Sequence, residues 1–154
     1  MFTTRTTPPG LARRMALVAA PFAGGALASV IAFLLIRDSF PDKVTTHFTL
    51  DGTADGYSSP VAALGQYMLV FAIEAAGTMA AGFSTRSALK STRSLCVFSC
   101  GLAAATAYLL IAAMLTASGS GGHTAQLPLF HLPVAVVVGA AVGGAAWLIS
   151  RRRA

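Results

Sequence analysis

The chain has 154 residues, of which 55% are hydrophobic and 10% charged, and it carries a net charge of +6 at pH 7. A soluble domain usually has about 25% charged residues, so this composition excludes an ordinary soluble domain and is typical of a membrane protein. The positive charge does not indicate nucleic-acid binding, because the arginines lie at the ends of apolar segments instead of forming one patch. We expect membrane lipid, and no nucleic acid, as their partner.

Four apolar segments are each long enough to cross a bilayer as a helix, which takes about 20 residues. They span residues 15–36, 61–83, 95–117 and 128–150. These segments show almost no polar face at helical period, so their surfaces are expected to face lipid or one another. The sequence therefore predicts an all-α integral membrane protein with four transmembrane helices.

The connecting segments differ in charge, and this difference predicts the orientation. The tail 1–14, the segment 84–94 and the tail 151–154 hold nine of the eleven Lys and Arg residues, whereas the segments 37–60 and 118–127 hold the other two. Lys and Arg in short loops stay on the cytoplasmic side of the membrane. We therefore expect both termini to be cytoplasmic and residues 37–60 to be extracellular.

The first apolar segment admits two interpretations, a cleaved signal peptide or a retained anchor. Arg13 and Arg14 precede it, as in a signal peptide, but the apolar run continues to residue 36, far beyond the usual apolar length of about 7 to 15 residues. We expect an anchor. Ala20, Gly24 and Ala28 lie four apart along it, a spacing that lets a second helix approach closely.

The polar segment 37–60 is expected to contain a short strand and turns. Three polar residues, Thr45, His47 and Thr49, alternate with the more apolar Val44, Thr46, Phe48 and Leu50. This alternation predicts a strand whose apolar face lies on the ends of the helices.

Two Asp-Gly pairs follow this strand, and each is typical of a turn. They are Asp51-Gly52 and Asp55-Gly56. The spacing of DGTADG also resembles the start of a calcium loop, but Ala62 stands where the last ligand of such a loop should be. We therefore interpret both pairs as turns and expect no metal there.

Nine residues of this segment form a pattern that follows a first membrane span: Pro41, Val44, Thr46, His47, Phe48, Gly52, Asp55, Gly56 and Tyr57. In this pattern the chain resembles domain-of-unknown-function family 1648, over about residues 20–80. The family occurs in small bacterial membrane proteins and at the front of SdpI-type immunity proteins. The chain departs from its pattern at Phe40, Thr45 and Ser59-Pro60. The resemblance implies a multi-pass protein of the bacterial plasma membrane.

We interpret the segment as a binding surface for an extracellular peptide, a lipid or a partner protein, in an immunity- or signalling-like role. Immunity is known for the SdpI branch of the family only. The expected contact residues are Pro41, His47, Phe48, Asp51, Gly52, Asp55, Gly56 and Tyr57. The alternatives are a small proton- or cation-coupled transporter and an accessory subunit of a larger membrane complex. We expect no enzyme and no cofactor, because the sequence shows no nucleophile with a base and no paired carboxylates.

Glu74 is the one acidic residue inside an apolar segment, where a charged group costs about 2.5 to 3.5 kcal/mol. Tyr67 and Thr78 share its stripe of the predicted helix. In the transporter alternative Glu74 is the central group; otherwise it makes a hydrogen bond between helices or lies near the inner interface. Its candidate partners on the third segment are Ser99, Thr106 and Tyr108.

The histidines, cysteines and remaining glycines are interpreted as structural. His47, His123 and His131 lack the close spacing of a metal site, and we expect interfacial or capping roles for these histidines. Cys96 and Cys100 lie on one helix face and are expected to be small apolar residues, with palmitoylation or metal binding as alternatives. Gly139 and Gly143 predict close helix packing, either within one chain or in a homo-oligomer.

Overall fold

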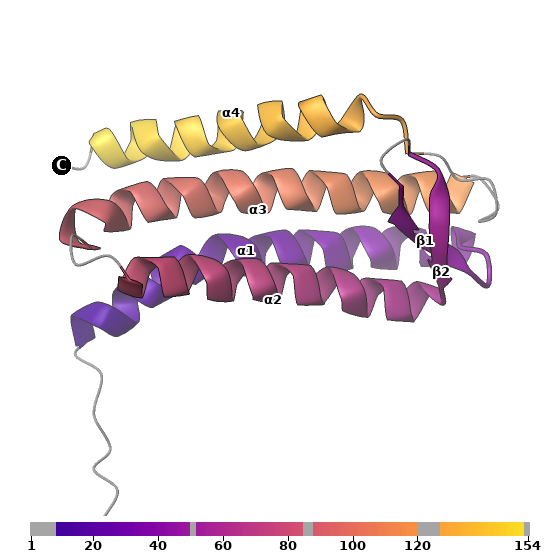
Figure 1. Cartoon of the computed structure of the whole chain (residues 1–154), viewed down its shortest axis with the longest axis horizontal. Helices are drawn as coiled ribbons and strands as arrows, with labels where there is room; N and C mark the ends of the chain where they lie inside the picture. Colours follow the sequence, from indigo (N-terminus) through magenta and orange to yellow (C-terminus); the bar gives the residue numbers. More distant parts are fainter. Residues whose placement is uncertain (1–8, 50–51, 85–87, 120–126, 153–154) are drawn as a thin grey trace, which may run out of the picture.

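A computed structural model describes residues 9–49, 52–84, 88–119 and 127–152. Four long helices run side by side through this part of the chain (Figure 1), namely α1 (Pro9–Ile36), α2 (Pro60–Ser84), α3 (Ala88–Gly119) and α4 (His131–Arg151). Each of the four contains a stretch that is long and apolar enough to cross a membrane. The predicted all-α, multi-pass membrane fold is confirmed.

Helix α3 is the centre of the bundle. It packs against α1, α2 and α4, and α1 also packs against α2. Helix α4 makes nearly all its helix contacts with α3 (Figure 1). Most of the surface of α4 is consequently left for lipid, in agreement with its exposed Leu132, Val136 and Val137.

The core consists of small apolar clusters between the helices. One contains Phe22 of α1, Phe71 of α2, and Ala103 and Ala107 of α3. Many larger apolar side chains point outward instead. Such an arrangement suits a bilayer, because lipid tails are as apolar as the side chains that face them.

Glycines allow α3 and α4 to approach each other closely. A methyl group on Gly101 would lie 2.9 Å from the carbonyl oxygen of Gly139, and one on Gly139 would lie 2.8 Å from the carbonyl oxygen of Gly101. Gly143 lies against the same part of α3, since a methyl group there would be 3.3 Å from the Val97 carbonyl oxygen. The predicted close packing at Gly139 and Gly143 thus occurs within one chain.

The three small residues of α1 that were expected to allow close helix packing do not do so within the chain. Ala20, Gly24 and Ala28 are exposed, and a methyl group on Gly24 would meet no atom within 4 Å. Close packing on α1 occurs at Gly25, where a methyl group would lie 2.7 Å from the ring of Phe71. The expectation of close packing at Ala20, Gly24 and Ala28 within one chain was therefore wrong for the described part of the chain, whereas self-association through these residues stays a prediction.

A short 3-10 turn (Arg37–Ser39) and a β-hairpin connect α1 to α2. The hairpin pairs β1 (Val44–Phe48) with β2 (Ala54–Ser58) in antiparallel fashion and lies at one end of the bundle (Figure 1). We call this the hairpin end, and the opposite end, where α1 begins and α4 finishes, the basic end. The predicted strand is confirmed, and a second strand accompanies it.

The structure contradicts one of the two predicted turns. Asp55 and Gly56 lie within β2, where Gly56 pairs with His47 of β1. A methyl group on Gly56 would lie 2.8 Å from the Cβ atom of His47. The glycine is therefore explained by the close approach of the facing strand and not by a turn.

The predicted alternation in β1 also fails at one residue. Thr45 was expected on the polar face, but it is fully buried, with 0% of its surface exposed. The strand register shifts between Thr45 and His47, and such an irregularity changes which side chains point to a given face.

Candidate functional site

The base of the hairpin is fixed to the helices. Val44 at the start of β1 is buried in a cluster with Ala63 of α2 and Ala117 of α3, and Phe40 packs against this cluster. The Phe40 ring also stacks on Phe33 of α1, with 5.4 Å between ring centres. The base of the hairpin therefore lies on the ends of three helices. The side chain of Phe48 and Leu50, which belong to the predicted apolar face, lie outside the described residues.

The tip of the hairpin is fixed as well, by Gly52. This residue has a φ angle of 83°, and its carbonyl oxygen accepts a hydrogen bond of 3.2 Å from the backbone N–H of Leu127, just before α4. A methyl group on Gly52 would lie 2.6 Å from the carbonyl oxygen of Leu127. The predicted turn at Gly52 is present, and it also joins the hairpin to the α3–α4 connection.

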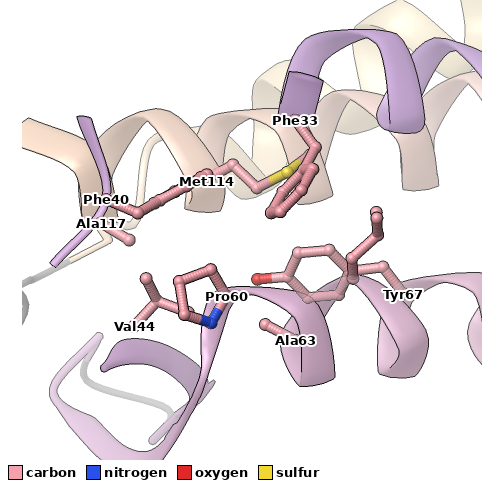
Figure 2. A pocket seen from close by; sticks show the side chains of 9 residues that line it. Phe33, Phe40, Val44, Pro60, Ala63, Tyr67, Met114 and Ala117 are labelled. Carbon is pink, nitrogen blue, oxygen red and sulfur yellow. The ribbon is translucent and has the colours of Figure 1, made fainter. Parts of the chain in front are cut away.

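The space beneath the hairpin is too small for a ligand. Figure 2 shows the side chains around it, with the hydroxyl group of Tyr67 pointing inward. The space amounts to about 10 Å³, which is room for about one water molecule. The space beneath the hairpin is therefore part of the packed base of the hairpin and not a ligand pocket.

Three of the expected contact residues lie on the surface that the hairpin presents to solvent. His47 of β1 and Asp55 of β2 face each other with 2.5 Å between Nδ1 and Oδ1, and their side chains are 72% and 45% exposed. Tyr57 is exposed two residues farther along β2. We call His47, Asp55 and Tyr57 the hairpin triad. It offers a hydrogen-bonding pair and an aromatic ring on one short sheet.

The other expected contact residues lie elsewhere. Pro41 is half-buried before β1, and Gly52 is buried at the tip, so Gly52 serves to dock the hairpin. Gly56 lies opposite His47. Asp51, the side chain of Phe48 and His123 lie outside the described residues.

Glu74 joins α2 to α3. The hydroxyl group of Thr106 donates a hydrogen bond of 2.6 Å to Glu74 Oε1, so Thr106 is the partner among the three candidates. Thr78 donates to the backbone carbonyl oxygen of Glu74, at 2.7 Å. Tyr67 belongs to a separate cluster with Phe33 and Met114. Of the three residues on the predicted stripe, Glu74 and Thr78 therefore lie in one local environment and Tyr67 in another.

His131 is the first residue of α4, and its ring Nδ1 lies 2.8 Å from the hydroxyl group of Tyr108 on α3. Tyr108 is therefore engaged at the hairpin end and not with Glu74. Among the residues that the structure describes, no three His, Cys, Asp or Glu side chains come together in a way that could hold a metal ion. Cys96 and Cys100 are free thiols, both half-buried on α3.

The sequence analysis missed the residues that hold the hairpin in place. Leu127 and Ala117 make the contacts at the tip and the base of the hairpin, and neither belongs to a recognisable motif. The sequence also placed Arg93 in the segment between two membrane spans, whereas α3 already begins at Ala88 and includes Arg93. Only contacts between distant segments reveal these roles.

The fold and this surface define a multi-pass membrane protein with a β-hairpin docked on one end of its helices. Residues 24–70 match the model of the family described as Domain of unknown function (DUF1648). The predicted domain is therefore confirmed, and the match covers α1 from Gly24, the hairpin and α2 as far as Val70. No curated protein and no solved structure matches the chain.

Proposed function

We propose that this protein is a recognition protein of the bacterial plasma membrane, and that it binds an extracellular peptide through the hairpin triad. The observation that carries the proposal is the fixed hairpin: Val44 and Gly52 hold it at base and tip, while His47 and Asp55 stay exposed. A surface that is already ordered loses little conformational entropy on binding, which favours affinity.

The charge distribution supports an extracellular hairpin. The hairpin end carries Asp38, Asp42 and Asp55, whereas the basic end carries most of the Lys and Arg residues. Basic residues in short loops remain in the cytoplasm. The hairpin triad would then meet secreted molecules.

The outer strand of the sheet favours a peptide over other partners. Within the described residues the sheet has two strands, and β1 is the strand that packs on α2 and α3. The far edge of β2 can therefore accept an extended peptide by backbone hydrogen bonding, while side chains beside it supply specificity. A secreted peptide also agrees with the match to family 1648, a domain that occurs at the front of SdpI-type immunity proteins.

Photo-crosslinking in living cells tests the proposal. A photoreactive phenylalanine derivative at position 57 should yield a discrete peptide adduct. The same derivative at position 38, whose side chain is 92% exposed at the same end but outside the hairpin, should yield none.

A matched pair of variants then tests the triad. Asp55→Asn should reduce the adduct at position 57, because it removes the charge that pairs with His47. Asp42→Asn removes the same charge from an exposed position before β1 and should leave the adduct unchanged. Equal adducts at positions 57 and 38, or equal effects of the two variants, would contradict the proposal.

A further inference from the structure

We propose a second binding site at the basic end, independent of the hairpin. It is a groove between α1, α3 and α4 that holds an anionic phospholipid, with the lipid phosphate bound to Arg93. The groove has a volume of about 360 Å³, at the lower end of the range for ligand sites, about 300 to 1,000 Å³. It suits the polar head and glycerol of a lipid whose tails extend along the bundle.

Arg93 is a preorganised cation in this groove. Its Nε donates a hydrogen bond of 2.7 Å to Ser150 Oγ, and its Nη2 donates one of 3.1 Å to the backbone carbonyl oxygen of Trp147. Neither acceptor carries a formal charge, so the positive charge of Arg93 is not neutralised by them. A guanidinium group also has more N–H donors than these two bonds use, and the remaining ones can bind a phosphate.

The lining of the groove changes from polar to apolar in the direction expected for a lipid. Thr92, Arg93 and Ser150 line it near the helix ends, and Cys96 and Ala146 also line it. The latter two lie about 5 Å deeper along their helices. Leu17 of α1 is a further apolar wall and is itself exposed. A lipid whose headgroup lies at the polar part of the groove would therefore place its tails against apolar side chains.

The charge around the groove is complementary to an anionic headgroup. All five acidic residues of the chain lie between positions 38 and 74, away from this end. Arg14 lies within one turn of Leu17, and Arg151, whose guanidinium lies 4.5 Å from the Trp147 ring centre, directly follows Ser150. Basic pockets between helices on the cytoplasmic side are typical sites for anionic lipid headgroups.

Native mass spectrometry of the full chain in a neutral detergent tests this site, with phosphatidylglycerol and phosphatidylcholine as probes. Phosphatidylglycerol should bind. Phosphatidylcholine has the same phosphate but adds a choline cation that Arg14 and Arg151 would repel, so it should bind at least about tenfold more weakly. Glycerol phosphate, which has the phosphate but no tails, should not bind detectably. Equal binding of the two lipids would overturn the proposal.

Three variants locate the site. Arg93→Gln should weaken phosphatidylglycerol binding about tenfold, through the loss of a charged hydrogen bond. Arg152→Gln removes the same charge from an exposed position at the same end and should weaken binding less than about threefold.

Ala146→Phe keeps every charge and fills the groove, so it should weaken binding as much as Arg93→Gln does. Ala146→Phe also tests the site if Arg93→Gln does not fold, because Arg93 remains bonded to α4 in the Ala146→Phe variant. Unchanged binding by Ala146→Phe, or equal losses in the Arg93 and Arg152 variants, would show that the lipid senses only general surface charge.

Discussion

Among the described residues, only Gly52 combines two features that require a glycine, a positive φ angle and a close approach to another segment. Its φ angle is 83°, a region where a side chain costs about 1 to 2 kcal/mol. Its α-carbon also faces the carbonyl oxygen of Leu127, which a methyl group would approach to 2.6 Å. Gly52 thus stands at the point where the hairpin meets the rest of the protein.

Gly52→Ala should therefore destabilise the docked hairpin by about 1 to 3 kcal/mol. Hydrogen exchange measures this locally, because the Leu127 N–H that donates to Gly52 should exchange faster. Gly65→Ala is the matched control, since a methyl group at that helical position meets no atom within 4 Å. Similar exchange at Leu127 in both variants would contradict the assigned role.

Glu74 and Thr106 form a hydrogen bond between two helices, and a double-mutant cycle can isolate it. Glu74→Ala and Thr106→Ala should show a coupling energy of about 0.6 to 1.7 kcal/mol, the range found for such bonds in membranes. Unfolding in mixed micelles provides the measurement. Additive effects would mean that the bond contributes nothing to stability.

Glu74→Gln provides a further comparison, because the amide oxygen can still accept from Thr106. This variant should keep most of the stability that Glu74→Ala loses. A stable Gln variant that loses ion flux in liposomes would instead favour the transporter alternative.

At the scale of elements, α4 depends on its contact with α3. Gly101→Leu should displace α4, because even a methyl group there would lie 2.9 Å from the Gly139 carbonyl oxygen. Overpacking of this kind costs about 1 to 3 kcal/mol, measurable as a lower unfolding midpoint in detergent.

Gly144→Leu on α4 is the control for this contact. A methyl group at Gly144 meets no atom within 4 Å, and the residue is exposed, so its substitution should change stability by less than about 0.5 kcal/mol. A comparable loss in both variants would mean that helix propensity or lipid contact, and not the α3–α4 approach, sets the stability.

The hairpin shows which elements a sequence reveals and which it does not. Strand β1 was predictable from the β-branched and aromatic residues between Val44 and Phe48, although Thr45 does not follow the predicted alternation. Strand β2 was not, because Asp55-Gly56 is typical of a turn. The reason for Gly56 is its neighbour His47 on the facing strand, and no local pattern contains that contact.

For the whole molecule, the bilayer makes the number of helices predictable and the choice of helix partners unpredictable. A membrane span must be a long apolar run, so each helix is recognisable by itself. Which helices touch depends on distant residues: Glu74 had three candidate partners, and Arg93 bonds to Ser150, 57 positions away. The proposed binding surface and the proposed lipid groove both depend on such contacts.

The peptide proposal also rests on one orientation of the whole molecule, which cysteine labelling can determine. In a background with Cys96→Ala and Cys100→Ala, we would introduce Ser59→Cys at the hairpin end and Arg152→Cys at the basic end. Both positions are exposed. A membrane-impermeant maleimide should label position 59 in intact cells and position 152 only after permeabilisation, because basic ends stay in the cytoplasm.

The reverse pattern would contradict the extracellular-peptide proposal, since the hairpin triad would then face the cytoplasm. The groove at Arg93 would still face a membrane surface, and lipid binding in detergent would be unaffected, so the two proposals fail separately.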